Sequence, residues 1–328
     1  MNTLKEIYQA NEELNYIDSS LYSRYRVKAG LRNDNGTGVK VGLTKICDVI
    51  GYKIIHEKKY NIDGQLIYRG YPINYLVDKQ PKDRIFGFEE VAFLLIFGTL
   101  PTEEQLQEFK DYLLNFKMGP VDLQYETPNI LNALQIEVLK LYAKDPSADT
   151  DDLEERMMKG LNILASIPLF TFSYARNKVF KSYPYPNKSF AENILCMARG
   201  NDQYTFEEAK ILDTLLMVHA DHGGGNNSTF ANVVISSTGT DIYSCISAAI
   251  GSLKGPKHGG ANCKVTNMFK AIFHEVGFTT DESTLKKVAN RLLDKDFFDH
   301  SGLIYGIGHA IYTKSDPRAL LIQQQCER

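Results

Sequence analysis

The chain has 328 residues, of which 43% are hydrophobic and 23% charged, and its formal net charge is -3. This length favours about two domains, and this composition is typical of a globular protein with a sizeable core. The small acidic charge argues against binding to nucleic acid or to an anionic membrane surface. No apolar run reaches the roughly 18 residues of a membrane span, and no signal peptide is expected, so we predict a cytoplasmic protein.

The five cysteines are scattered along the chain, and no two of them form a CxxC pair. An odd and scattered set favours reduced thiols over disulfides or a zinc site. These residues are Cys47, Cys196, Cys245, Cys263 and Cys326.

The N-terminal part combines a polar segment with short β-like runs. Residues 1–30 could form a helical arm, and a turn-rich loop follows over 30–38. Two runs typical of β-strands lie at 53–56 and 65–68, and Asp63-Gly64 stands between them. Because this dipeptide is typical of tight turns, the pattern predicts a β-hairpin that turns at Asp63-Gly64.

From residue 88 onward the apolar residues recur every three or four positions, which predicts helices. The first helix should end at Gly98, and Thr102 with Gln105 and Thr205 with Glu208 match the capping box of a helix start. One long helix contains Pro168, where strain or a kink is expected. The predicted helices cover approximately 88–97, 102–118, 132–143, 151–177, 205–216, 239–253 and 261–276. The fold class is therefore mainly α with a minor N-terminal β-hairpin.

Three of the seven histidines lie in glycine-rich breaks between the predicted helices: His222, His258 and His309. Glycine permits tight turns and a close approach of the backbone to a ligand. Imidazole is well suited to proton transfer and to hydrogen bonding near neutral pH. We interpret these three histidines as candidates for a functional site.

A metal site is the alternative interpretation of His219 and His222, which are three residues apart. No third ligand has an indicative spacing, and the glycines at 223–225 would unwind the helix there. We therefore expect no metal, and we expect His219 to complete the end of a helix. The glycine-rich stretches do not match a phosphate-binding loop.

His258 directly precedes a predicted helix that starts near Asn262. The positive end of a helix dipole disfavours an imidazolium there, so a neutral ring could donate a hydrogen bond to a carbonyl and stabilise an enol or enolate. Arg318, in Asp316-Pro317-Arg318, could clamp a carboxylate, and an ion pair with Asp316 is the alternative. The residues alone thus favour histidine-dependent carbonyl chemistry on an anionic substrate.

These segments resemble the citrate synthase family, which includes citrate and 2-methylcitrate synthases. The resemblance is carried by HADHGGGNNSTF at 219–230, GSLKGPKHGGAN at 251–262, GIGH at 306–309 and DPR at 316–318. Gly30-Leu31-Arg32 and Tyr68-Arg69-Gly70-Tyr71 resemble the N-terminal part of the family.

The resemblance implies a helical fold with a large domain over 1–262, an incomplete small domain over 263–328, and a homodimer. It implies condensation of acetyl-CoA with oxaloacetate and hydrolysis of the citryl-CoA intermediate, with no metal and no bound cofactor. His258 would hold the thioester carbonyl, and His309 would act as an acid on the oxaloacetate carbonyl. Oxaloacetate would be held by His222, Asn226 and Arg318. Coenzyme A would be approached by Gly255, Pro256, Gly259, Gly260 and Lys314.

One departure from the family pattern concerns the catalytic base. The aspartate that removes the methyl proton lies beyond the DPR segment in the family, and no residue of this chain matches it. We therefore expect a truncated and catalytically impaired form. The alternatives are a non-catalytic dimerising remnant, which binds ligand or pairs with a full-length subunit, and a 2-methylcitrate synthase that uses propionyl-CoA. Thr313 stands where many members carry a basic residue, a role that Lys314 could take.

Overall fold

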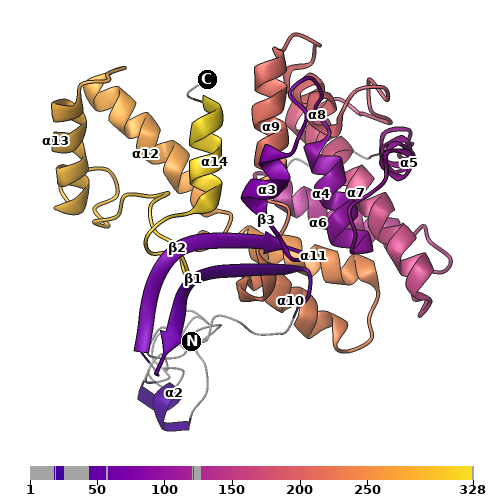
Figure 1. Cartoon of the computed structure of the whole chain (residues 1–328), viewed down its shortest axis with the longest axis horizontal. Helices are drawn as coiled ribbons and strands as arrows, with labels where there is room; N and C mark the ends of the chain where they lie inside the picture. The colour runs from indigo at the N-terminus through magenta and orange to yellow at the C-terminus, as the bar shows by residue number, and fades with distance from the viewer. Residues whose placement is uncertain are drawn as a thin grey trace, which may run out of the picture.

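The computed structural model describes residues 18, 20–25, 44–56, 58–119, 121 and 127–326. Within them, helices surround a three-stranded sheet, which confirms the mainly α class with a minor β-hairpin (Figure 1). Of the arm predicted over 1–30, the short helix α2 (Ser20–Tyr25) is described. The predicted loop over 30–38, with the Gly30-Leu31-Arg32 motif, lies outside the described residues.

The β-hairpin is formed by the antiparallel strands β1 (Cys47–Ile55) and β2 (Lys58–Tyr68), and the short β3 (Tyr71–Pro72) pairs with the end of β2. The predicted turn at Asp63-Gly64 is wrong, because β1 ends at Ile55 and both residues lie inside β2. The register of the two strands shifts beside them. An Asp-Gly pair therefore marks a β-bulge here, a feature that shares its preference for glycine with tight turns.

The main helical body confirms the predicted helices and their start signals. Both predicted capping boxes are present, and α4 ends at Gly98, whose φ of 92° is in the left-handed region. The long helix α7 runs through Pro168. The helices of this body are α3 (Ile73–Asp78), α4 (Gly87–Phe97), α5 (Glu103–Leu114), α6 (Ile130–Tyr142), α7 (Leu153–Arg176), α8 (Phe190–Arg199), α9 (Phe206–Val218), α10 (Asn227–Ser236) and α11 (Ile242–Leu253).

A single large cluster of buried side chains joins the sheet to this body. It combines Tyr68 of β2 with Leu94 of α4, Leu113 of α5 and Leu169 of α7. It also includes Leu321 of α14 (Pro317–Cys326), so the last described helix packs on the main body. The predicted domain boundary after residue 262 stays a prediction.

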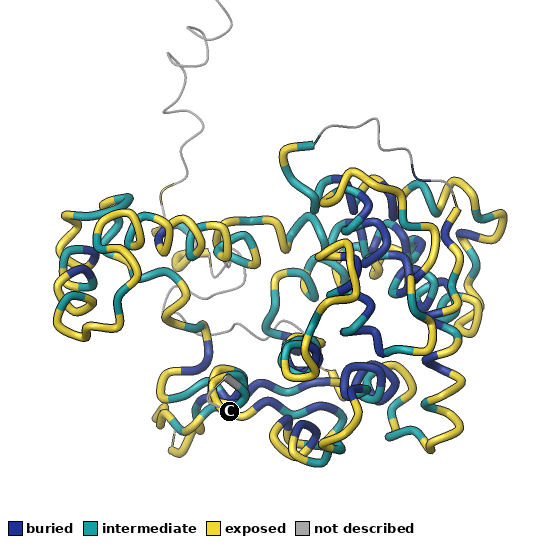
Figure 2. Tube along the Cα trace, turned by 90° about the horizontal axis from the view of Figure 1, so that it is seen from above, coloured by how far each residue is buried: buried dark blue, intermediate teal, exposed yellow. Residues whose placement is uncertain are grey.

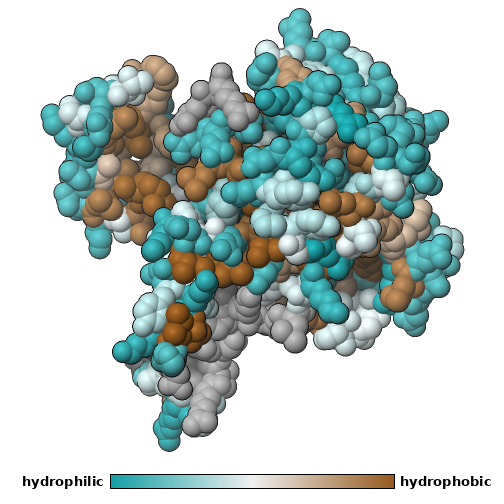
Figure 3. Space-filling view, viewed as in Figure 1, coloured by the Kyte–Doolittle hydropathy of each residue, from teal (hydrophilic) through white to brown (hydrophobic). Residues whose placement is uncertain are grey.

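Two helices extend to one side of the main body: α12 (Ala261–Val276) and α13 (Glu282–Leu293). Their buried residues are Met268, Val288 and Leu292, and most of this pair is exposed or half-buried (Figure 2). Figure 3 shows apolar side chains gathered over these helices, and Phe269 and Phe273 of α12 are 61% and 57% exposed. The buried apolar surface of the protein therefore lies mainly outside this pair.

The described part of the chain contains no helix with the length and apolar character needed to span a membrane. The described cysteines form no disulfide, as predicted. Cys47, Cys196 and Cys245 are buried, and Cys263 is exposed.

Candidate functional site

His222 lies in the connection between α9 and α10, where glycines replace the helix. The glycines that follow it form a 3-10 turn, Gly223–Gly225, and Gly223 has a φ of 68°. The Nε2 atom of His222 lies 2.8 Å from Nε2 of His309, which belongs to a loop 87 residues later in the chain. The structure thus brings together two of the three histidines that the sequence singled out.

The hydrogen bonds of His309 define the tautomer of this pair. Its Nδ1 accepts hydrogen bonds from the backbone N–H groups of Ile311 at 3.1 Å and Tyr312 at 3.0 Å. An accepting Nδ1 carries no proton in a neutral ring, so we assign the proton to Nε2. His309 Nε2 then donates to His222, whose own proton lies on Nδ1, a buried atom with no hydrogen-bond partner among the described residues. The His309 Nε2–H therefore faces His222 in the absence of ligand, and a substrate carbonyl would have to take over this hydrogen bond.

His222 is poorly suited to carry a positive charge. Burial first, and then the electrostatic influence of the neighbouring His309 and Arg318, lower the pKa of His222 to about 4. A neutral His222 can accept the hydrogen bond from His309 near neutral pH. The pair is therefore an uncharged donor–acceptor unit in the absence of ligand.

Arg318 lies beside this pair at the start of α14 and forms a bidentate ion pair with Asp316. Its Nε donates to Oδ1 at 3.0 Å, and its Nη2 donates to Oδ2 at 2.7 Å. The guanidinium is 18% exposed. The alternative that the sequence left open, a pair with Asp316, is thus present, and a substrate carboxylate would have to share or replace this contact.

His258 is tied to a different element. It lies in the turn between α11 and α12, and its Nε2 is 3.2 Å from the hydroxyl oxygen of Ser228 in the first turn of α10. Burial lowers its pKa, which favours the neutral ring expected from its place before α12. Ser228 follows His222 by six residues, so the start of α10 connects the two parts of the candidate site.

The predicted ligand-binding residues around these histidines also have structural roles. Asn226 is the N-cap of α10, because its side-chain oxygen accepts from the backbone of Ser228 at 2.7 Å and of Thr229 at 3.3 Å. Its amide nitrogen is the group that could donate to a substrate. A side chain at Gly260 would overlap the carbonyl of Lys254, so this position serves the packing of the turn. Lys314 is exposed.

A family model described as "Citrate synthase, C-terminal domain" matches residues 32–328. The chain belongs to the citrate synthase family. It is 36% identical over 294 residues to a citrate synthase of Haloferax volcanii, covering 84% of this chain and 72% of the relative. It is 33% identical to 2-methylcitrate synthase 1 of Corynebacterium glutamicum, covering 78% and 65%. These relatives confirm the family resemblance inferred from the motifs.

A crystal structure of citrate synthase from Thermotoga maritima has the same fold, with a TM-score of 0.65 and 27% identity. The alignment covers 90% of this chain and 72% of that structure. The chain spans between 61% and 72% of the length of its curated relatives, and several of them fall below two thirds. The activity of the whole relatives is therefore treated as a proposal for this chain.

Sequence reasoning missed two side chains at this candidate site. Ser228 contacts His258, and Tyr312 stacks on His309 with ring centroids 4.6 Å apart. The signals were weak: Ser228 lies two residues after a helix N-cap, and Tyr312 lies three residues after the histidine. The contact of Ser228 with His258 joins segments 30 residues apart, and the stacking of Tyr312 on His309 depends on the folded shape of their loop, so the sequence alone did not reveal either.

The metal interpretation finds no support in the described residues. His219 is the C-cap of α9, as predicted, and its Nδ1 lies 2.8 Å from the carbonyl of Leu215. His222 instead faces His309. No group of three His, Cys, Asp or Glu side chains is arranged to hold a metal ion in the described part of the chain.

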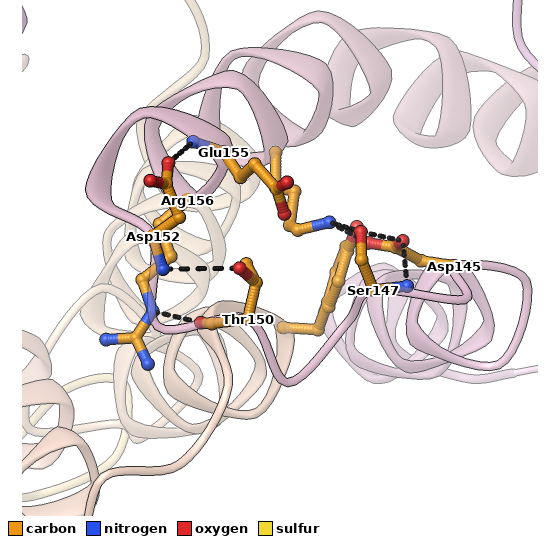
Figure 4. Close-up of polar contacts among 8 residues, drawn as sticks. Asp145, Ser147, Thr150, Asp152, Glu155 and Arg156 are labelled. Carbon is orange, nitrogen blue, oxygen red and sulfur yellow. Dashed lines mark hydrogen bonds and ion pairs between the residues drawn. The ribbon is translucent and has the colours of Figure 1, made fainter.

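A cavity of about 720 Å³ lies away from the histidines, between the end of α6, the start of α7 and α11. At its base Lys159 donates to Ser147 at 2.9 Å and pairs with Asp145, which also accepts from Tyr243 at 2.8 Å. At its rim Asp152 caps α7 (Figure 4). The buried ammonium of Lys159 is thus neutralised by the Asp145 carboxylate within the cavity. None of the candidate histidines lines this cavity. The cavity therefore lies apart from the candidate functional site.

Proposed function

We propose that the chain binds oxaloacetate and an acyl-CoA thioester at the histidine loops and joins them by citrate synthase-type condensation. The observation that carries this proposal is the donating Nε2–H of His309, which is fixed by two backbone N–H groups on Nδ1. A fixed neutral donor can polarise the ketone carbonyl of oxaloacetate and then protonate the alkoxide that forms on it. Family membership supports the same role.

His258 is proposed to act on the thioester. As a neutral imidazole it would donate to the thioester carbonyl, so that loss of a proton from the acyl methyl gives an enol instead of a free enolate. Ser228 orients this ring from the start of α10. The enol carbon then attacks the polarised ketone, a carbon–carbon bond forms, and water cleaves the resulting thioester to release coenzyme A.

Oxaloacetate is proposed to lie between His222, Asn226 and Arg318. Arg318 supplies a planar guanidinium for a carboxylate. Coenzyme A is proposed to approach the turn that contains Gly255, Pro256, Gly259 and Gly260, and the exposed ammonium of Lys314 would meet its phosphates. No metal and no resident cofactor is assigned to this reaction.

The contacts among the described residues identify no base that could take the proton from the acyl group. Among the described residues, no carboxylate forms a hydrogen bond or ion pair with His258, and Asp316 is engaged by Arg318. A positioned base contributes about 10²–10⁴-fold to a rate. We therefore propose that these 328 residues alone bind substrates and turn over slowly.

Thiol release tests the function. The purified 328-residue chain is given oxaloacetate with acetyl-CoA and then with propionyl-CoA, and the citrate synthase of Haloferax volcanii is measured beside it. We expect release that is about 10²–10⁴-fold slower than that of the relative. The better thioester decides between citrate and 2-methylcitrate synthesis, since relatives of both names match this chain.

As a control, the same substitution of histidine by glutamine is made at one residue inside the candidate site and at one residue outside it. His258→Gln should abolish the release, and His274→Gln, on the exposed side of α12, should leave it unchanged. A rate equal to that of the relative would contradict the slow turnover. Absence of both thiol release and calorimetric oxaloacetate binding would refute the proposed function and leave a dimerising protein as the alternative.

We further propose that the chain forms a homodimer through α6, α10 and α11. These helices are neighbours, and α10 buries none of its residues although half of them are apolar. The exposed apolar side chains on them include Ile136, Leu139, Phe230, Val233, Val234 and Leu253. An apolar surface shared by adjacent helices is typical of an interface with a second copy.

A further inference from the structure

A loop from a distant part of the chain crosses the β-hairpin at its β-bulge. Ile50 lies opposite Gln65 and Tyr52 lies opposite Asn61, so Gly51 alone faces three residues of β2. Gly64 is one of those three residues. Glycines on both strands of a bulge indicate that another backbone approaches closely.

That backbone is the loop that carries His309. A side chain at Gly51 would overlap the carbonyl of Ile311, and one at Gly64 would overlap the carbonyl of Ser315. The backbone N–H of Gly64 donates to the Ser315 hydroxyl at 3.1 Å. The Tyr312 hydroxyl donates to the carbonyl of Gln65 at 3.1 Å. The Ser315 hydroxyl also donates to Asp63 Oδ1 at 3.4 Å, so the hairpin holds the loop at both strands and by three hydrogen bonds.

The loop that carries His222 contacts the same hairpin at its other end, where β1 begins and β2 ends. The hydroxyl of Tyr68, at the end of β2, lies 3.1 Å from the carbonyl of Met217 and 3.2 Å from that of Asp221. The backbone N–H of Asp221 donates to this hydroxyl at 3.2 Å. A Cβ atom at Gly223 would come within 2.8 Å of the carbonyl of Cys47 in β1.

We propose that the β1–β2 hairpin is a template that positions His309 against His222, with Gly64 and Tyr312 as its positioning residues. Tyr312 connects the template to the site, since its ring stacks on His309, its backbone N–H donates to His309 Nδ1, and its hydroxyl is anchored on β2. The effect of the hairpin on catalysis rests on the proposed function. Its effect on the arrangement of the two imidazole rings is independent of that function.

The proposal predicts an effect of the hairpin on the imidazoles themselves. A displacement of about 1 Å in a site can reduce a rate by about 100-fold. Gly64→Ala forces the Ser315 carbonyl away from β2 and moves the loop. Tyr312→Phe keeps the ring and the backbone and removes the hydroxyl anchor alone. Gly119→Ala is the matched control, since the nearest atom to its new Cβ is the Lys144 ammonium nitrogen at 4.0 Å.

The experiment uses the full chain without substrate and follows the imidazole nitrogens by nitrogen-15 NMR. Wild type and Gly119→Ala should show His309 protonated on Nε2 and His222 protonated on Nδ1. Gly64→Ala should give mixed tautomers at both rings, and Tyr312→Phe should shift the His309 resonances. In the thiol-release assay we expect a loss of about 100-fold for Gly64→Ala. For Tyr312→Phe we expect a rise of about five-fold in the KM for oxaloacetate, equivalent to one hydrogen bond.

Wild-type imidazole spectra in both hairpin variants would overturn the proposal, and so would an equal change in Gly119→Ala. If Gly64→Ala does not fold, the Tyr312→Phe spectrum decides. If the spectra change as expected while the wild type releases no thiol, the positioning role stands and the proposed function fails.

Discussion

At the scale of single residues, the pair of His222 and His309 differs from two isolated histidines. Their Nε2 atoms lie 2.8 Å apart, so at most one proton fits between them. Burial lowers the pKa of His222 to about 4, well below its ordinary value of 6.5. Between these two pH values the unfolded chain binds a proton at this position more readily than the folded chain does. The contribution of His222 to folding stability therefore rises with pH across this window and is constant above it.

Substitution of His222 by Gln tests this coupling. For the wild type we expect the His222 contribution to the free energy of unfolding to increase between pH about 4.5 and about 7, by at most about 3 kcal/mol. His222→Gln should lose that part of the slope, because glutamine does not titrate. Urea unfolding at several pH values measures it, with exposed His274→Gln as the control. An unchanged slope in His222→Gln would show that this ring is protonated in the folded state.

Residue patterns selected the candidate residues of the site, and the contacts in the structure show what such patterns cannot predict. Glycine on both sides singled out His222, His258 and His309, because only functional or tightly turning backbone needs that context. The partner of Arg318 stayed open between a substrate and Asp316, since spacing cannot tell which acid fills a guanidinium. The contact of Ser228 with His258 depends on how α10 meets the turn before α12, which is a property of the fold.

At the scale of elements, two buried carboxylates accept hydrogen bonds from the starts of α4 and α8. Asp213 of α9 accepts from the backbone N–H groups of Gly87 and Phe88 at the start of α4. Glu89 of α4 accepts from the N–H of Phe190 at the start of α8, and its second oxygen is buried with no hydrogen-bond partner in the described part of the chain. Burial first, and then the charge of Asp213, raise the pKa of Glu89 well above its usual value. A neutral Glu89 therefore suits this junction.

The variant Glu89→Gln tests the junction. A carboxyl whose pKa is raised in the folded state loses stability as the pH rises above the ordinary value of 4.5, since the unfolded chain releases the proton first. Glutamine keeps the acceptor for Phe190 and does not ionise. We expect Glu89→Gln to match the wild type at pH about 5 and to exceed its stability by about 2 kcal/mol at pH about 9.

Thermal unfolding followed across this pH range makes the comparison. Glu108→Gln, on the exposed side of α5, is the control and should follow the wild type at every pH. A wild type that remains the more stable protein at alkaline pH would mean that Glu89 is ionised in the folded state and paired with Lys110. In that case the lysine, whose Nζ lies 3.3 Å from the centroid of the Phe86 ring, would have to reach the carboxylate instead.

Capping boxes in the sequence predicted helix starts well where no conflicting loop signal lay next to them. Thr102 and Thr205 open capping boxes, and both helices begin there. Ser189 with Glu192 is a third box, but it follows a loop rich in proline and tyrosine, and α8 was missed. Asp63-Gly64 was misjudged because a bulge and a turn demand the same residues. The bulge and the turn are distinguished only by the loop that crosses the hairpin, which lies more than 240 residues later in the chain.

At the scale of the whole molecule, the sequence motifs predicted the family and the mainly α class, but they could not predict which long-range packing completes the core. Tyr312 and Leu321 join the same buried cluster as β2 and α9, although some 90 residues separate them from α9. The α12–α13 pair, in contrast, buries few of its side chains. Such differences depend on the folded arrangement, because the apolar periodicity of α12 resembles that of the buried helices.

The homodimer is the prediction that belongs to this scale. Val233 of α10 is 47% exposed in the single chain, at the centre of the apolar surface proposed for the interface. A charge buried there without a partner is costly, so Val233→Glu should convert a dimer into a monomer. Light scattering after gel filtration measures the mass of both proteins at micromolar concentration. Phe273→Glu, on the equally exposed face of α12, should remain dimeric, and a monomeric wild type or a dimeric Val233→Glu would show that this face is covered by something other than a second copy.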